Sequence, residues 1–188
     1  KRIPVCLSAH AAVDAVSGLR TTHDLAVSEI EAIGCDVPPI VRANLKYATP
    51  RNPREAQFSM PFAIAAPLRF QALSLAQLND ECLRDQTLRI LMARVSMTTG
   101  PMWDDPGKRD SAPEGAHVSL RMRGGALLDP YSAKAHGSAA TPLSAQTFYN
   151  KLRRLPLPSM ASGGAVGVAS TLAPTDQRAE SRNRRWVT

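Results

Sequence analysis

Residues 53–70, PREAQFSMPFAIAAPLRF, form the most apolar stretch of this 188-residue chain, and the other elements can be placed around it. Polar residues stand mainly at the two ends of the stretch, which is typical of a buried helix. Pro53 suits the first turn of such a helix, where its missing backbone N–H would be unpaired anyway. Pro61 and Pro67 remove donors further along, so the stretch predicts a bent helix or two short helices.

Upstream of this stretch, the pattern predicts one helix and one strand. Apolar residues at helical spacing indicate an amphipathic helix over residues 8–20. Residues 30–37, IEAIGCDV, are rich in strand-forming types and end at two prolines, as a strand leaving a sheet does. A further strand or extended run is expected over residues 45–48, and the sequence TPRNPRE then predicts a loop.

Downstream, helices and strands are mixed without strict βαβ order, which indicates the α+β class. Polar and apolar residues alternate over residues 117–123, the period-two pattern of a half-buried strand. Gly124-Gly125 can then turn the chain into a second strand. The other expected elements are helices over 75–83 and 86–93, strands over 94–98 and 126–128, a loop over 100–115, and a helix over 144–152 with Ser144 as N-cap.

The composition changes abruptly after Arg154. Residues 155–188 are rich in Gly, Ala, Ser and Pro without helical or strand period, which predicts a disordered basic tail. Seven basic residues against two acidic ones follow Asn150, so residues 151–188 carry +5 of the net charge of +7. A frameshift or altered splice is a second explanation of the abrupt change. Nucleic-acid binding by the tail ranks last, because no aromatic stacking platform accompanies the charge.

Composition also narrows the class of protein. Hydrophobic residues make up 44% and charged residues 21% of the chain, as in ordinary globular domains. No apolar run approaches the roughly 18 residues that a membrane span needs, so a cytoplasmic location and no membrane partner are expected. The chain has an odd number of cysteines, and these three, Cys6, Cys35 and Cys82, are widely spaced. This favours buried thiols over a disulfide framework or a zinc site.

Residues 53–70 also resemble a stretch of the MmgE/PrpD family, whose members include 2-methylcitrate dehydratase, cis-aconitate decarboxylase and iminodisuccinate epimerase. The matching residues are Glu55, Ala56, Phe58, Ser59, Pro61 and Phe62 here, Arg84, Asp85, Leu88 and Leu91 downstream, Lys1, Pro4, His10, Asp14 and Ala15 upstream, and the segment TPLSAQTFYNKL near the end. Pro67 and Phe70 depart from the family pattern. The resemblance implies a small mixed helix and antiparallel-sheet domain over residues 1–154, the C-terminal part of a larger enzyme, followed by the tail over 155–188.

What the resemblance implies about activity is a lyase or isomerase acting on small di- or tricarboxylates, similar to 2-methylcitrate dehydratase. Such chemistry needs cations for carboxylates and a positioned acid or base, and it requires no metal or other cofactor. The resemblance assigns catalytic roles to Lys1, Tyr47 and His10, and substrate binding is a candidate role for Glu55 and Ser59. Structural alternatives stay open for all five: a surface lysine, a half-buried tyrosine, a satisfied histidine and two helix caps.

Family members carry a long helical portion before this segment, and that portion supplies acid and histidine residues of the active site. These 188 residues do not include it, so the chain alone is expected to be inactive, and its expected partners are the small carboxylate, the helical domain or subunit and a second copy in a homodimer. The alternative function is a non-catalytic dimerisation or subunit-pairing module.

Overall fold

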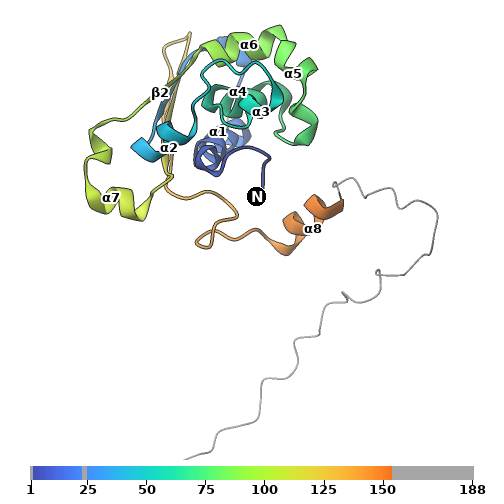
Figure 1. Ribbon diagram of the computed structural model, residues 1–188. Helices are drawn as coiled ribbons and strands as arrows, with labels where there is room; N and C mark the ends of the chain where they lie inside the picture. Colours follow the sequence, from blue (N-terminus) through green and yellow to red (C-terminus); the bar gives the residue numbers. More distant parts are fainter. Residues whose placement is uncertain (1, 23–24, 154–188) are drawn as a thin grey trace, which may run out of the picture. The chain divides into compact units, whose positions relative to one another are not determined.

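Several helices lie against one face of a mixed β-sheet in the computed structural model, which describes residues 2–22 and 25–153 (Figure 1). The α-helices are α1 His10–Thr22, α2 Pro39–Asn44, α3 Pro53–Ala56, α4 Met60–Phe70, α5 Asp80–Arg84, α6 Gln86–Ala93, α7 Pro106–Ser111 and α8 Ala145–Arg153. The strands are β1 Ile30–Asp36, β2 Val95–Thr98, β3 Ala116–Met122, β4 Leu127–Leu128 and β5 Tyr131–Ser132. Four 3-10 turns are η1 Leu7–Ala9, η2 Val27–Glu29, η3 Leu75–Gln77 and η4 Pro101–Trp103. The expected α+β class is confirmed.

The sheet has the order β2-β1-β3-β4, and β5 also pairs with β3. Strands β1 and β2 run parallel, with Cys35 opposite Met97. All the other pairs are antiparallel, and Cys35 lies opposite Val118 on β3. The expectation of an antiparallel sheet therefore holds for every pair except β1 with β2, which the helical segment between them allows to run parallel.

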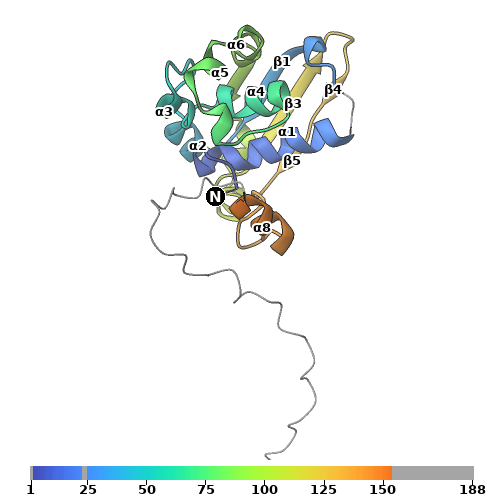
Figure 2. The ribbon, with the colours of Figure 1, turned by 90° about the vertical axis from the view of Figure 1, so that its right-hand side faces the viewer.

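One face of the sheet is buried and the other is largely open. Along β3, Val118 and Leu120 are fully buried, whereas Arg121 is exposed and its guanidinium lies 3.2 Å from the carboxylate of Glu31 on β1. This alternation is the period-two pattern predicted for residues 117–123. Figure 2 shows α1 and α4 lying across the strands, and both helices pack on the buried face.

The apolar stretch that begins at Pro53 folds as two helices, one of the two predicted outcomes, although neither Pro61 nor Pro67 interrupts α4. Asn52 caps α3 and Ser59 caps α4, and residues 60–68 are all buried. The break comes at residues 57–59, because Pro61 falls in the first turn of α4, where a missing N–H costs nothing. Pro67 stays within α4, which ends at Gln71 in the left-handed conformation with φ +56°.

Several expected elements are confirmed with small shifts of their ends. The elements that lie where the sequence pattern predicted them are helix α1, strand β1, helix α6, strand β2 and the turn from β3 into β4. The helix expected over residues 75–83 is instead the turn η3 followed by the short helix α5. At α8, the hydroxyl of Ser144 accepts from the backbone N–H of Thr147 at 3.2 Å, which confirms the predicted N-cap. The tail predicted over residues 155–188 lies outside the described residues.

Two expectations about the segments around β1 and β2 are wrong. Residues 45–48 form a loop and no strand, and the six residues before them form helix α2, because Pro39 starts the first turn without needing a hydrogen bond. The loop expected over residues 100–115 contains η4 and α7, whose N-cap is Asp105. This segment is ordered by contacts with distant residues, above all the buried Trp103.

Candidate functional site

Three segments that carry predicted site residues meet at the connection between α3 and α4. The backbone N–H of Cys6 donates to the carbonyl of Gln57 at 2.7 Å, and that of Tyr47 donates to the carbonyl of Phe58 at 3.2 Å. We call this pair of bonds, with the residues that form it, the junction. It joins the N-terminal segment, the loop after α2 and the cap of α4, which are far apart in sequence.

His10 is the first residue of α1 and is only 1% exposed. Its Nε2 lies 3.3 Å from the carbonyl oxygen of Val5, a contact that requires Nε2 to carry the proton and donate. This bond fixes the ring at the start of the helix, so a structural role for His10 is present. A ring held in one tautomer and orientation is also what an acid or base needs, and the catalytic role stays a prediction.

Tyr47 is 40% exposed and lies in the loop after α2, not at the end of a strand. Its backbone is held by Phe58, whereas its phenol reaches the surface. It is the predicted site residue whose side chain is most open to a ligand among those that the structure describes. Lys1 lies outside the described residues, so its predicted role stays a prediction.

The neighbour of Lys1 belongs to an ion cluster that the sequence did not predict. The guanidinium of Arg2 pairs with the carboxylate of Asp14 on α1, and that carboxylate is only 6% exposed. The backbone N–H of His136 donates to Asp14 at 2.7 Å, and the His136 imidazole lies 3.3 Å from the same oxygen. Asp14 therefore fastens the N-terminal segment and the segment after β5 to one helix.

Glu55 and Ser59 both act as caps in this structure. The Glu55 carboxylate accepts from the backbone N–H of Arg51 at 2.7 Å and from the amide of Asn52 at 3.2 Å. The Asn52 side chain in turn accepts from the Glu55 N–H at 3.0 Å, which is a reciprocal capping arrangement. The buried hydroxyl of Ser59 accepts from the N–H of Phe62 at 3.2 Å. The capping alternative is thus present for both, and substrate binding stays a prediction.

A second set of hydrogen-bonded polar side chains lies beside the junction, and the sequence pattern did not predict it. The hydroxyl of Ser8 in η1 donates to Glu114 at 2.6 Å and accepts from the amide of Asn44 at 3.0 Å. These residues come from η1, the end of α2 and the loop before β3. Their separation in sequence is 36 and 106 residues, so no local pattern could have indicated the contact.

Exposed apolar side chains occur in and beside the segments that meet at the junction. Leu7, Ile40 and Phe58 are 47%, 52% and 45% exposed, and α2, which carries Ile40, packs against η1, which carries Leu7. Single exposed apolar residues are ordinary, but several around one polar site indicate a contact surface. The junction therefore includes one residue with an exposed phenol, Tyr47, and one with an exposed apolar side chain, Phe58.

The three cysteines are free and differ in reactivity. Cys35 is fully buried in β1, and burial raises the pKa of its thiol to about 12, which keeps it protonated and unreactive. Cys6 and Cys82 are only partly buried, so the expectation of buried thiols is right for Cys35 alone.

Two kinds of feature are absent from the part of the chain that the structure describes. No group of three or more His, Cys, Asp or Glu side chains there is placed to hold a metal ion. Of the helices within residues 2–22 and 25–153, none has both the length and the hydrophobicity needed to cross a lipid bilayer.

Comparison with known families gives one match. The sequence model of the MmgE/PrpD C-terminal domain matches residues 3–163, which include every described element from η1 to α8. The match begins before η1 and reaches into the stretch whose composition predicts a tail. A search among curated proteins found no match.

Proposed function

This chain belongs to the MmgE/PrpD family, and from that premise we propose that it forms the C-terminal part of a lyase or isomerase acting on small di- or tricarboxylates. The observation that carries the proposal is the junction, which gathers Tyr47, the segment leading to His10 and the cap of α4 at one place. In this proposal the junction faces the family's helical portion, and the active site lies between the two.

The roles follow from the chemistry of proton transfer next to a carboxylate. Tyr47 presents an exposed phenol, which can donate a proton or a hydrogen bond to a developing carbanion or carboxylate. His10, held by the Val5 carbonyl, positions the start of α1 and is a candidate acid or base. Lys1 is the candidate cation for a substrate carboxylate, and the anchored neighbour Arg2 keeps its segment in place.

Glu55 and Ser59 support the site through the backbone. Their caps fix the ends of α3 and α4, and hence the carbonyl groups of Gln57 and Phe58 that hold the other two segments. We infer that substrate binding by their side chains would compete with these caps. Dehydration, decarboxylation and epimerisation all fit this set of residues, and the 2-methylcitrate dehydratase reaction is one of the three.

A matched pair of tyrosine variants tests the proposal in the enzyme assembled with its helical portion. Tyr47→Phe removes only the hydroxyl and is expected to lower kcat by about 10²-fold, the effect of losing a general acid or base. Tyr131→Phe is the control, because Tyr131 is 41% exposed and lies on β5. Equal activity of the two variants would remove Tyr47 from the mechanism.

A non-catalytic pairing module is the second candidate, and the exposed side chains of Leu7, Ile40 and Phe58 favour it. It predicts a stable complex with a helical subunit or a second copy, without turnover. Light scattering coupled to size-exclusion chromatography tests this contact, because Leu7→Ser with Phe58→Ser should abolish assembly if the apolar rim forms it. Turnover by the assembled protein then distinguishes the enzyme from the pairing module.

A further inference from the structure

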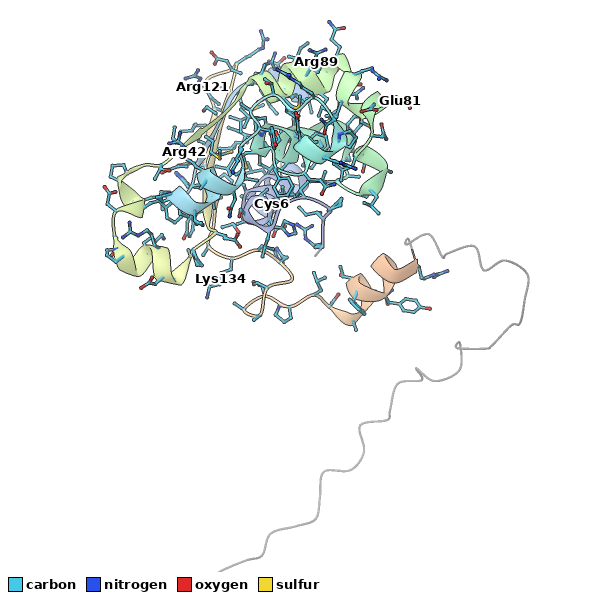
Figure 3. The ribbon with its side chains drawn as sticks, viewed as in Figure 1. Cys6, Arg42, Glu81, Arg89, Arg121 and Lys134 are labelled. Carbon is cyan, nitrogen blue, oxygen red and sulfur yellow. The ribbon has the colours of Figure 1, made fainter. Side chains whose placement is uncertain are left out.

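A polar pocket, whose lining includes none of the residues of the junction, lies between the loop after Tyr47 and the helices α5 and α6. It has a volume of about 510 Å³, within the range of pockets that hold small molecules. Three arginines line it: Arg51 from the loop, Arg84 from the last turn of α5 and Arg89 from α6. Figure 3 shows Arg89 on the outer side of α6, apart from Cys6 in the N-terminal segment.

The three guanidinium groups have no ion-pair or hydrogen-bond partner within residues 2–22 and 25–153. The nearby carboxylates are already engaged. Asp85 accepts from both Nε and Nη2 of Arg69 at 3.1 Å, and Glu55 accepts from the backbone of Arg51 and from Asn52. Neither Asp85 nor Glu55 lines the pocket, and Asp80 is the acidic residue in its lining. The pocket therefore carries three positive charges against one negative charge.

The other lining residues fit the carbon skeleton of a ligand. Leu83 is 9% exposed and Met92 is half-buried, and together they form an apolar wall beside the arginines. Guanidinium groups bind carboxylates and phosphates through paired hydrogen bonds. Neither His10 nor Tyr47 lines this pocket, so a ligand here goes beyond the proposed function.

We propose that this pocket binds a small organic polyanion, whose carboxylate or phosphate groups pair with Arg51, Arg84 and Arg89 while its carbon skeleton contacts Leu83 and Met92. The carboxylate of Asp80 repels anions and so limits the negative charge of the ligand that the pocket accepts. The same carboxylate can accept a hydrogen bond from a ligand hydroxyl. A bound anion would also join the loop after α2 to α5 and α6, and so stabilise the segment that carries Tyr47.

Calorimetric titration of the 188-residue chain with citrate and with inorganic pyrophosphate tests this inference. Saturable binding that weakens with added salt is expected for at least one of them, because salt screens the charges. Binding of citrate alone identifies a carboxylate ligand, and binding of pyrophosphate alone identifies a phosphate ligand. Absence of saturable binding by both probes at millimolar concentration would overturn the proposal.

Variants that change one charged residue of the pocket test whether the anion binds there. Arg84→Gln and Arg89→Gln should each weaken binding about tenfold, as expected when one charge-assisted pair is lost. Asp80→Asn removes a repelling charge and should tighten binding about two- to threefold. All three residues are exposed, so the variants should keep the thermal unfolding midpoint of the parent chain.

Two controls remove one or two positive charges from residues that are not among those lining the pocket. Arg42→Gln lies on α2 outside the pocket, and Arg184→Gln with Arg185→Gln removes charge from the C-terminal arginine cluster. Neither control should change the affinity by more than about twofold, since long-range charge effects are small in physiological salt. If either control weakens binding as much as Arg84→Gln does, the binding is a general effect of positive charge and the pocket is not the site.

Discussion

The indole N–H of Trp103 donates to the carboxylate of Asp36 at 3.1 Å, and the same carboxylate oxygen accepts from the backbone N–H of Gly100 at 2.6 Å. Trp103 is fully buried, and Asp36 is the last residue of β1. One acidic residue thus fastens η4 and the segment that follows β2 to the end of the central strand.

Removing this acceptor is expected to lower the free energy of unfolding. Asp36→Ala leaves a buried indole N–H unpaired, which costs about 1–3 kcal/mol. Asp36→Asn keeps an acceptor oxygen at the same position and should cost less. Urea unfolding measures both, and the near-ultraviolet circular dichroism of Trp103 should weaken in Asp36→Ala. Equal stability of Asp36→Ala and the parent chain would contradict this account of the anchor.

The pH dependence of stability should include a contribution from Asp85. Hydrogen bonds from Arg69 and from the N–H of Leu88 lower the pKa of this carboxyl below its ordinary 3.8. A lowered folded-state pKa stabilises the fold above the unfolded value, and this contribution is lost as the pH falls through the folded-state pKa.

Two substitutions of Asp85 separate the ion pair from the cap. Asp85→Asn keeps the cap of α6 and should cost about 0–1 kcal/mol at neutral pH, the usual range for a surface ion pair. Asp85→Ala loses the cap as well and should cost about 1–2 kcal/mol. The difference between the parent and Asp85→Asn should disappear in strong acid. A difference that persists there would show that the ion pair is not its source.

Thiol labelling should separate the three cysteines. Cys35 is expected to resist an alkylating reagent in the native protein, because burial both blocks access and raises the pKa of its thiol to about 12. Cys6 and Cys82 are partly exposed and should react. Mass spectrometry of peptides from the native and the urea-unfolded protein checks this, and native labelling of Cys35 at the rate of Cys82 would contradict it.

His10 should affect both folding and turnover. His10→Ala removes the buried hydrogen bond from the imidazole to the Val5 carbonyl and is expected to lower the free energy of unfolding by about 1–3 kcal/mol. In the assembled enzyme a further loss of kcat is expected if His10 also transfers a proton. Stability and kcat measured on the same variant distinguish the roles, since a structural role alone leaves kcat intact at a temperature where the variant is folded.

Much of the fold could be predicted because local patterns encode it. The caps at Asn52 and Ser59 explain why the apolar stretch divides into α3 and α4, and the alternation over residues 117–123 gives β3 and its buried face. The family resemblance carried by residues such as Glu55 and Phe58 is confirmed by the domain match.

The rest depends on contacts between distant residues. Helix α2 is only six residues long, and the segment with η4 is ordered by the bond from Trp103 to Asp36, 67 residues away. The Arg2–Asp14 pair and the Ser8–Glu114 bond likewise join segments that no spacing rule connects. Sequence reasoning named single candidate residues, whereas their grouping at the junction arises from tertiary packing.

The most direct test of the central claim is turnover of 2-methylcitrate, cis-aconitate and iminodisuccinate by the purified chain, before and after addition of the helical portion of a family enzyme. The proposal predicts no turnover by the chain alone and turnover of at least one substrate by the assembled protein. Turnover by the chain alone would contradict it, as would an assembled protein that turns over none of the three.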